Sequence, residues 1–218
     1  VVPIEPQPDF AIGGVAVDSK GRALLSQDLW LTGLYAAGGS ADSGMHGADV
    51  IPGNRILDDL IGGSNAGLSA AKWSGTVGFG NQDFLHEMAL LAENSIEMLS
   101  RTESGQSVGA GLASLRRLMN SSMGLERDGV IISSCSAQIE EMVKENTRIS
   151  DESFVMNTEL IRALELQGML ALARTIASTA DAREESRGSH RRIDYPEMDE
   201  EQSESLVVDA EGIITTLN

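Results

Sequence analysis

Residues 29–73 carry the pattern that most constrains the fold: a strand-like run, a glycine-bearing loop and a helical periodicity. The run 29–37 ends in Gly38 and Gly39, and a long loop follows. Residues 55–73 carry apolar side chains at helical spacing, which predicts a helix with one apolar face. A strand that leads through glycines into a helix lets backbone N–H groups at the helix start approach a ligand. We therefore expect an α/β unit with a ligand-facing loop.

Glycines interrupt the predicted helix at Gly62, Gly63 and Gly67. A glycine inside a helix costs about 1 kcal/mol relative to alanine, and it is tolerated where another backbone or a ligand comes close. The apolar face comprises Ile56, Leu57, Leu60, Ile61, Leu68 and Ala71. Upstream, residues 10–18 alternate as a strand and 19–22 supply a turn.

Residues from about 83 to 185 carry a different pattern, with one helix after another. The predicted helices span 84–99, 109–119, 128–145 and roughly 158–183. Helices of this length joined by short loops favour antiparallel neighbours, so a bundle is the simplest packing. The apolar stripe of the first helix comprises Leu85, Met88, Ala89, Ala92, Ile96 and Leu99. That of the last comprises Ile161, Leu164, Ala171, Ile176 and Ala180, flanked by Leu160 and Met169.

The remaining tail is highly charged over 184–204 and ends in two short apolar runs. The runs 206–208 and 213–214 predict a terminal hairpin. We therefore expect three regions: an α/β segment over 1–80, a helical bundle domain over 81–185, and a charged tail with terminal strands over 186–218.

The net charge of −17 restricts the class of partner. Such an acidic surface repels phosphate backbones, which argues against nucleic-acid binding. No run approaches the roughly 20 apolar residues that span a bilayer, so we expect no membrane span. Only three of the 16 basic residues are lysines. Adaptation to a salt-rich cytoplasm and a high-GC genome both account for that bias.

Metal and thiol chemistry find little support in the sequence. A single cysteine, Cys135, excludes an internal disulfide, an iron–sulfur cluster or a cysteine-based zinc site within this chain. With no histidine nearby in sequence, Cys135 is expected to be a small buried residue. His86 lies in a predicted helix with only Asp83 as a nearby carboxylate on its face, so we expect an exposed histidine and no metal site.

Three ordered blocks carry a resemblance to a known family. The first is DFAIGGV at 9–15, where the family places a His-aromatic pair before a Gly-Gly strand. The second is GLYAAGG at 33–39, followed by HGA at 46–48 and GNRIL at 53–57. The third begins at residue 157 and ends in ESRGSHRRIDYP at 185–196.

These blocks resemble the C-terminal part of the FAD-dependent succinate dehydrogenase/fumarate reductase flavoproteins, which are also similar to L-aspartate oxidases. The resemblance implies the C-terminal part of a Rossmann-like FAD-binding domain, followed by a helical bundle domain and a terminal hairpin. It implies that the loop and helix block reaches the flavin. The implied FAD-contacting residues are Gly38, Gly39, His46, Gly47, Asn54, Arg55 and Ile56.

The family's G-x-G-x-x-G fingerprint and its substrate-capping domain are not in this sequence. FAD binding would therefore need the dinucleotide-binding half from another chain or from a preceding N-terminal part. An iron–sulfur or other electron-transfer subunit is a further implied partner. The resemblance places such a heteromeric electron-transport protein in the cytoplasm, or on the cytoplasmic side of a membrane at its periphery.

Several positions depart from the family pattern. Asp9 stands where the family has a substrate-binding histidine, Gly39 where it has a FAD-contacting glutamate, and Val50 where it has a carboxylate-binding arginine. Arg55 replaces a serine at the helix start. Valine forms no bidentate pair with a carboxylate, and an aspartate repels a dicarboxylate. The remaining weak candidates for a catalytic group are Asp9, His46 and Arg55.

Three functions remain open. The first is a part of a flavin-dependent oxidoreductase that completes the FAD site and handles a substrate other than unmodified succinate or fumarate. The second is a degenerate, non-catalytic assembly subunit of such a complex. The third is a stand-alone interaction module built on the helices. The basic spot His190, Arg191 and Arg192 fits either salt bridges within the tail or a contact with a partner.

Overall fold

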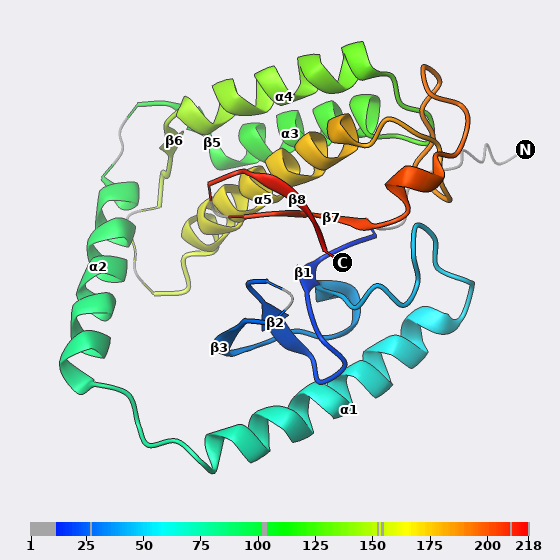
Figure 1. Cartoon of the computed structure of the whole chain (residues 1–218). Helices are drawn as coiled ribbons and strands as arrows, with labels where there is room; N and C mark the ends of the chain where they lie inside the picture. Colours follow the sequence, from blue (N-terminus) through cyan, green and yellow to red (C-terminus); the bar gives the residue numbers. More distant parts are fainter. Residues whose placement is uncertain are drawn as a thin grey trace, which may run out of the picture. The chain divides into compact units, whose positions relative to one another are not determined.

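The computed structural model describes residues 12–26, 28–101, 104–151, 153, 155–209 and 211–217. Its contacts divide the chain into two compact units, residues 1–78 together with 184–218, and residues 79–183. The charged tail and its terminal strands therefore belong to the same compact unit as the N-terminal α/β segment (Figure 1).

The first unit is built from short strands and one long helix. Its elements are β1 (Val15–Ala16), β2 (Arg22–Leu24), β3 (Trp30–Tyr35), η1 (Gly38–Ser40), β4 (Ala41–Asp42), α1 (Asn54–Ser74), η2 (Glu200–Gln202), β7 (Ser205–Val208) and β8 (Ile214–Leu217). Strand β1 pairs with β4 in parallel, β2 with β3 antiparallel, and β7 with β8 antiparallel. The predicted terminal hairpin is confirmed. Of the strand predicted over 10–18, the described part keeps only β1 and a single bridge at Val17.

A tight turn before β2 brings the strands onto α1. The backbone N–H of Gly21 donates to the Asp18 carbonyl at 2.9 Å, and Gly21 adopts a φ of 71°. A Cβ on Gly21 would lie 2.5 Å from the Cβ of Ala66 on α1. The glycine therefore serves both the left-handed turn and the close packing of the helix.

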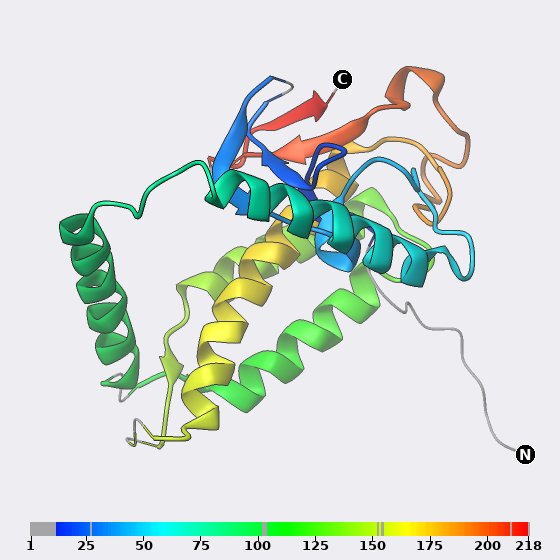
Figure 2. The same ribbon diagram turned by 90° about the horizontal axis from the view of Figure 1, so that it is seen from below.

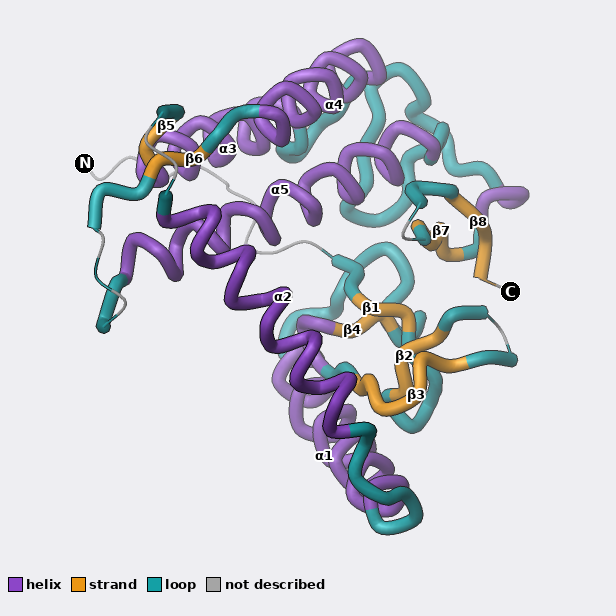
Figure 3. The backbone as a smooth tube through the Cα atoms, turned by 90° about the vertical axis from the view of Figure 1, so that its left-hand side faces the viewer, coloured by secondary structure: helices purple, strands orange, loops and turns teal. Residues whose placement is uncertain are grey.

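An aromatic cluster fixes the strands against the C-terminal half of α1. Trp30 meets Tyr35 and Trp73 edge-to-face, with ring centroids 5.6 and 5.9 Å apart, and the Arg22 guanidinium lies over the Trp30 ring. Edge-to-face pairs add about 0.5–1.5 kcal/mol beyond the area they bury. Figure 3 shows strands β1 to β4 gathered beside α1.

The three helix glycines differ in their surroundings. A Cβ on Gly62 would lie 3.7 Å from the Ala37 Cβ and from the Gly38 nitrogen, so the helix passes close to η1 there. At Gly63 and Gly67 a Cβ would meet nothing within 4 Å. The expected close approach is therefore present at Gly62 and absent at the other two within the described residues.

The second unit is helical. Its elements are α2 (Gln82–Ser100), β5 (Gln106–Ser107), α3 (Val108–Ser122), α4 (Gly129–Lys144), β6 (Thr147–Arg148) and α5 (Thr158–Ala182). Each helix begins behind a side chain that accepts a backbone N–H: Asn81, Ser107, Asp128 and Asn157. Such caps stabilise a helix by roughly 1 kcal/mol, which explains why the predicted helix starts are close to the observed ones.

Helices α3, α4 and α5 form the predicted bundle and lie side by side in Figures 1 and 2. Strands β5 and β6 pair in parallel, so the start of α3 and the end of α4 lie at the same end of the bundle. The largest fully buried apolar side chains are Leu115, Ile132 and Ile139. Burying each contributes about 1.5–3 kcal/mol.

The stripe predicted for the last helix is wrong. The buried residues of α5 are Ala163, Leu166, Leu170, Ala173, Ala177 and Ala180. Ile161 and Leu164 are exposed, whereas Ala180 of the predicted stripe is buried and Ile176 is partly buried against the same core. Small alanine side chains let α5 approach α4 closely, so the alanine-rich face turns inward. On α2, Phe84, Leu85 and Met88 are exposed, and Leu99 near its end packs against Val108 and Ala163.

Among the described residues, none of the helices combines the length and the apolar character needed to cross a membrane.

Candidate functional site

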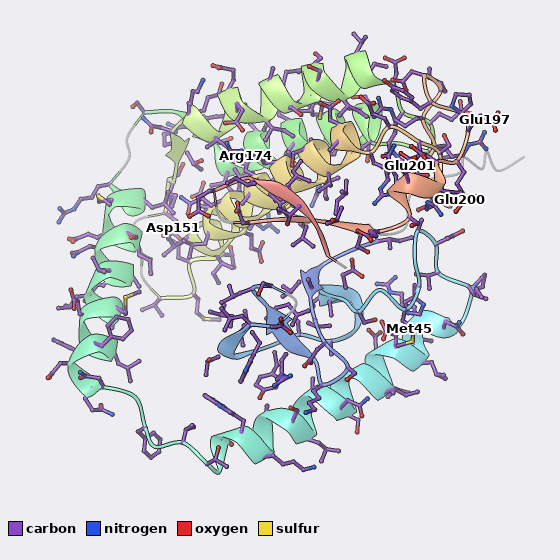
Figure 4. All side chains as sticks on the ribbon, viewed as in Figure 1. Met45, Asp151, Arg174, Glu197, Glu200 and Glu201 are labelled. Atoms are coloured by element: carbon purple, nitrogen blue, oxygen red, sulfur yellow. The ribbon has the colours of Figure 1, made fainter. Side chains whose placement is uncertain are left out.

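The loop between β4 and α1 folds back over the start of α1 and encloses a small pocket. The pocket has a volume of about 40 Å³. Its walls are formed by Ile12, Gly13, Gly38, Gly39, Ala41, Asp42, Ser43, Met45, His46, Gly47, Val50, Arg55 and Asp58. Met45, labelled in Figure 4, lies on this loop beside the first turns of α1. The hollow is too small to hold a whole dinucleotide cofactor.

Gly38 lies where the strand segment touches α1. It adopts a φ of 58°, and a Cβ there would lie 2.0 Å from Oδ1 of Asp59. The next residue, Gly39, donates its backbone N–H to the same oxygen at 3.2 Å. Asp59 thus anchors the glycine turn to α1, and only a residue without a side chain fits at position 38.

His46 pairs with a carboxylate of α1. Its Nε2 lies 3.4 Å from Oδ2 of Asp58, and the two side chains are 19% and 17% exposed. That Nε2 is buried, and its contact with Asp58 lacks hydrogen-bond geometry. Buried polar atoms without a hydrogen bond are uncommon in folded proteins.

The first turn of α1 lacks a side-chain cap. Gly53 is the N-cap residue, with a φ of 93° and no capping side chain, and the Asn54 N–H donates to the Ile51 carbonyl at 3.0 Å. In contrast, α2, α3, α4 and α5 each begin behind a capping side chain. The positive end of the helix dipole favours an electronegative group at this end.

Acidic side chains dominate the charged part of the pocket wall. Asp42 accepts the backbone N–H of Gly44 at 2.9 Å, and Asp58 faces His46. Val50 presents an apolar side chain to the same pocket. Among the described residues of the wall, Arg55 is the one arginine, so a second guanidinium that could hold a pair of carboxylates is not found there.

The charged tail reaches the same loop. Ser189 donates its backbone N–H to the carbonyl of Ala48 at 3.0 Å, and its hydroxyl donates to that same oxygen at 2.9 Å. Gly188 adopts a φ of 55°, and a Cβ there would lie 2.5 Å from the Ala48 oxygen. Two segments 141 positions apart in sequence are therefore joined at the loop that carries His46.

A network of ion pairs holds the tail turn. Glu185 is fully buried. Its carboxylate accepts a hydrogen bond from the Arg187 Nε–H at 2.9 Å and another from the backbone N–H of Asp199 at 2.8 Å. Arg187 donates onward to the Asp199 carbonyl. Arg192 forms a bidentate pair with Asp194, at 2.8 and 2.7 Å. Of the two readings of the basic spot, salt bridging within the tail is therefore observed for Arg192.

The structure brings most of the predicted site residues together. Gly38, Gly39, His46, Gly47 and Arg55 line the pocket, and Asn54 and Ile56 flank Arg55 in the first turn of α1. Asp9 lies outside the described residues.

Sequence reasoning missed Asp58, Asp59 and Ser189. Asp58 lies one helical turn beyond Asn54, a spacing that could have marked it as a neighbour of the loop. Nothing in the sequence pairs Ser189 with residue 48.

The other isolated candidates, His86 and Cys135, lie on helices outside the pocket. His86 is exposed on α2, and Cys135 is fully buried on α4. Burial raises the pKa of the Cys135 thiol, and a hydrogen bond with Ser122 offsets this only in part. No group of three or more metal-binding side chains occurs within the described part of the chain.

Comparisons with known proteins agree with this arrangement. Residues 112–210 match the family described as fumarate reductase flavoprotein C-term, and residues 2–56 match the FAD binding domain family. The fumarate reductase flavoprotein subunit of Haemophilus influenzae is 30% identical over 201 residues, which cover 91% of this chain and 33% of that protein. The corresponding subunit of Mycobacterium tuberculosis is 30% identical over 208 residues, covering 92% of this chain and 35% of that protein.

A solved structure gives the same result. A quinol fumarate reductase chain of Escherichia coli superposes with a TM-score of 0.84 at 27% identity, covering 94% of this chain and 35% of that one. This chain therefore spans about a third of the length of the curated relatives it matches. The chain belongs to the FAD-dependent succinate dehydrogenase/fumarate reductase flavoprotein family and corresponds to the C-terminal part of its members.

Proposed function

We propose that this chain supplies one wall of the FAD site of a flavin-dependent oxidoreductase that transfers hydride between FAD and an organic substrate. The single observation that carries the proposal is the pocket wall itself. It combines a glycine turn, the His46 imidazole, whose Nε2 meets Asp58 without hydrogen-bond geometry, and the start of α1, whose N-cap residue has no side chain. These features fit a flat, electronegative ring.

The residues of this wall have distinct roles in the proposal. The positive end of the α1 dipole, in the first turn that carries Asn54, Arg55 and Ile56, would stabilise negative charge on the isoalloxazine. His46 would donate or accept one hydrogen bond through Nε2, and Gly38 and Gly39 would leave room for close approach. FAD, when bound, supplies the hydride chemistry, and the protein supplies binding, orientation and electrostatics.

A second part of the protein must supply the dinucleotide-binding half. The apolar residues of α1 point to where it would pack, because Ile56, Leu60 and Leu68 are 68%, 67% and 60% exposed. The total accessible surface is 14810 Å². Even two separate compact domains of half this mass would together expose only about 11,600 Å². The excess supports a partner polypeptide, or a preceding part of the same polypeptide, that covers apolar surface.

The proposed substrate is an organic molecule other than unmodified succinate or fumarate. Val50 replaces the arginine that the family uses to hold a carboxylate, and Asp42 and Asp58 add negative charge to the pocket wall. A dicarboxylate would meet repulsion here in place of a bidentate pair. A neutral or cationic substrate fits this wall better.

The proposed electron-transfer partner and the proposed location are those that membership of the family suggests. An iron–sulfur or other electron-transfer subunit would accept the electrons, in a cytoplasmic protein or one at the cytoplasmic face of a membrane.

The second candidate function is a non-catalytic assembly subunit. The observation that favours it is the same loss of functional side chains, at Gly39 and Val50. In that case the pocket wall would serve only to complete the fold of a partner.

Substrate titrations on the assembled flavoprotein test the substrate proposal. We expect succinate and fumarate to leave the visible flavin spectrum of the wild type unchanged. The Val50→Arg variant should bind them at least tenfold more tightly, because a charge-assisted pair is worth about 1.5–3 kcal/mol. Ile51→Arg, at an exposed neighbouring position, adds the same charge and serves as the control. Tight binding of fumarate by the wild type would contradict the proposal.

A further inference from the structure

The turns within the loop that carries His46 are short-range, and the His46 side chain also meets Asp58 of α1. Within 43–54 the backbone hydrogen bonds other than the one from Ser189 connect residues at most three apart, such as Gly47 to Gly44 and Asp49 to His46. Turns of this kind set a local shape but do not fix a loop in space. Its position therefore depends on groups from elsewhere in the chain.

Ser189 provides such an anchor. Its N–H and its hydroxyl both donate to the carbonyl of Ala48, two residues beyond His46. Two donors on one acceptor fill both lone pairs of that carbonyl. The loop is thereby fixed at one peptide group, close to the imidazole that faces the pocket.

The turn that carries Ser189 is itself held by further hydrogen bonds. The left-handed Gly188 turns the tail towards Ala48, and the Arg187 N–H and the His190 N–H each donate to the other residue's carbonyl. Buried Glu185 and the Asp199 backbone then hold Arg187 in place. The turn at 187–190 is thus held by Glu185 and Asp199 as well as by its contact with Ala48.

We propose that Gly188 and Ser189 form a clasp that positions the His46 loop, so that the C-terminal tail sets the geometry of the proposed flavin wall. Ser189 is a positioning residue that acts through Ala48. The inference rests on the proposed function, because the clasp matters to FAD only if the pocket wall contacts it.

The first test compares FAD dissociation constants in the assembled flavoprotein. Ser189→Ala removes one of the two donors and should weaken FAD binding three- to tenfold, the effect of one lost hydrogen bond. Ser189→Thr keeps the hydroxyl and should restore binding to within about twofold of the wild type. Gly188→Ala, which places a Cβ 2.5 Å from the Ala48 oxygen, should weaken binding at least as much as Ser189→Ala.

Gly212→Ala is the matched control. Gly212 also has a positive φ, 83°, but a Cβ there meets nothing within 4 Å. The Gly212→Ala variant has backbone strain like that of Gly188→Ala but no steric clash with Ala48. Its FAD affinity should therefore equal that of the wild type. Equal losses of affinity in Gly188→Ala and Gly212→Ala would overturn the clasp.

Hydrogen exchange separates the clasp from the proposed function. In the assembled protein, Ser189→Ala should speed amide exchange over 45–50 at least threefold, while amides in the second half of α1 keep their rates. Unchanged exchange over 45–50 overturns the clasp even if FAD is bound. If the wild-type protein binds no FAD, the proposed function is contradicted. The exchange rates over 45–50 still test the clasp in that case.

Discussion

Neighbouring glycines at the site have different requirements. Gly38 needs both a left-handed backbone and empty space beside Asp59, whereas Gly39 needs neither, since a Cβ there meets nothing within 4 Å. The sequence motif marks both as family positions, but only the structure separates the steric demand of the first from the tolerance of the second. The glutamate that the family resemblance implies at position 39 would therefore fit this backbone.

Gly38→Ala should lower the free energy of unfolding by at least about 2 kcal/mol, through left-handed strain and the clash with Asp59. Urea unfolding followed by circular dichroism measures the change. Gly39→Ala, one residue on, is the control and should stay within about 0.5 kcal/mol of the wild type. Equal destabilisation of the two variants would show that the fit at Asp59 is unimportant.

Individual side-chain pairs were the least predictable feature from sequence. The resemblance placed His46 at the flavin wall, and the structure puts it in a pocket. Its pairing with Asp58 depends on how the loop between β4 and α1 folds back over α1, and no local propensity encodes that path. The Ser189 contact spans 141 positions, where sequence patterns carry no pairing information.

At the level of elements, helix boundaries followed from local signals and helix faces did not. Caps and amphipathic patterns located α1 to α5, because these signals act within a few residues. Helix α5 is apolar on two faces, and which one turns inward depends on how closely α4 approaches. The alanine-rich face allows the closer approach, so Ile161 and Leu164 remain outside.

The apolar face of α1 is predicted to be a packing surface for the dinucleotide-binding half. Leu57→Gln together with Leu60→Gln should weaken that association at least tenfold, because each buried leucine contributes about 1.5–3 kcal/mol. Co-purification from cells that express both parts measures it. Leu125→Gln, an equally exposed leucine outside α1, serves as the control. Undiminished association of the double variant would exclude this face.

The pH dependence of stability should reflect the burial of the Cys135 thiol in the helical bundle. Because burial raises the pKa of Cys135 above its ordinary value of 9.0, the neutral thiol is favoured in the folded state. Its stabilising contribution is complete below the unfolded pKa and is lost as the pH rises through the folded one.

Stability of the wild type should therefore fall relative to Cys135→Ala above about pH 9. Thermal midpoints of both proteins from pH 7 to pH 10 measure the difference. In the same native samples at pH 8, a thiol reagent should react with Cys135 only after unfolding. Rapid native labelling would mean that the thiol is accessible.

For the whole molecule, motif order predicted the family, because three spaced blocks constrain a long chain more than any one glycine loop does. The same blocks left the substrate and the partner open. In the proposal, the chain contributes a wall: a pocket face, a helix start and a tail that meets the loop.

The most direct test of that account is the FAD content of the purified assembled protein, with and without this chain. Visible absorbance and released flavin should show one FAD per assembly when the chain is present, and loss of nearly all of it when the chain is removed. Full FAD occupancy and unchanged activity without this chain would contradict the claim that it completes the flavin site.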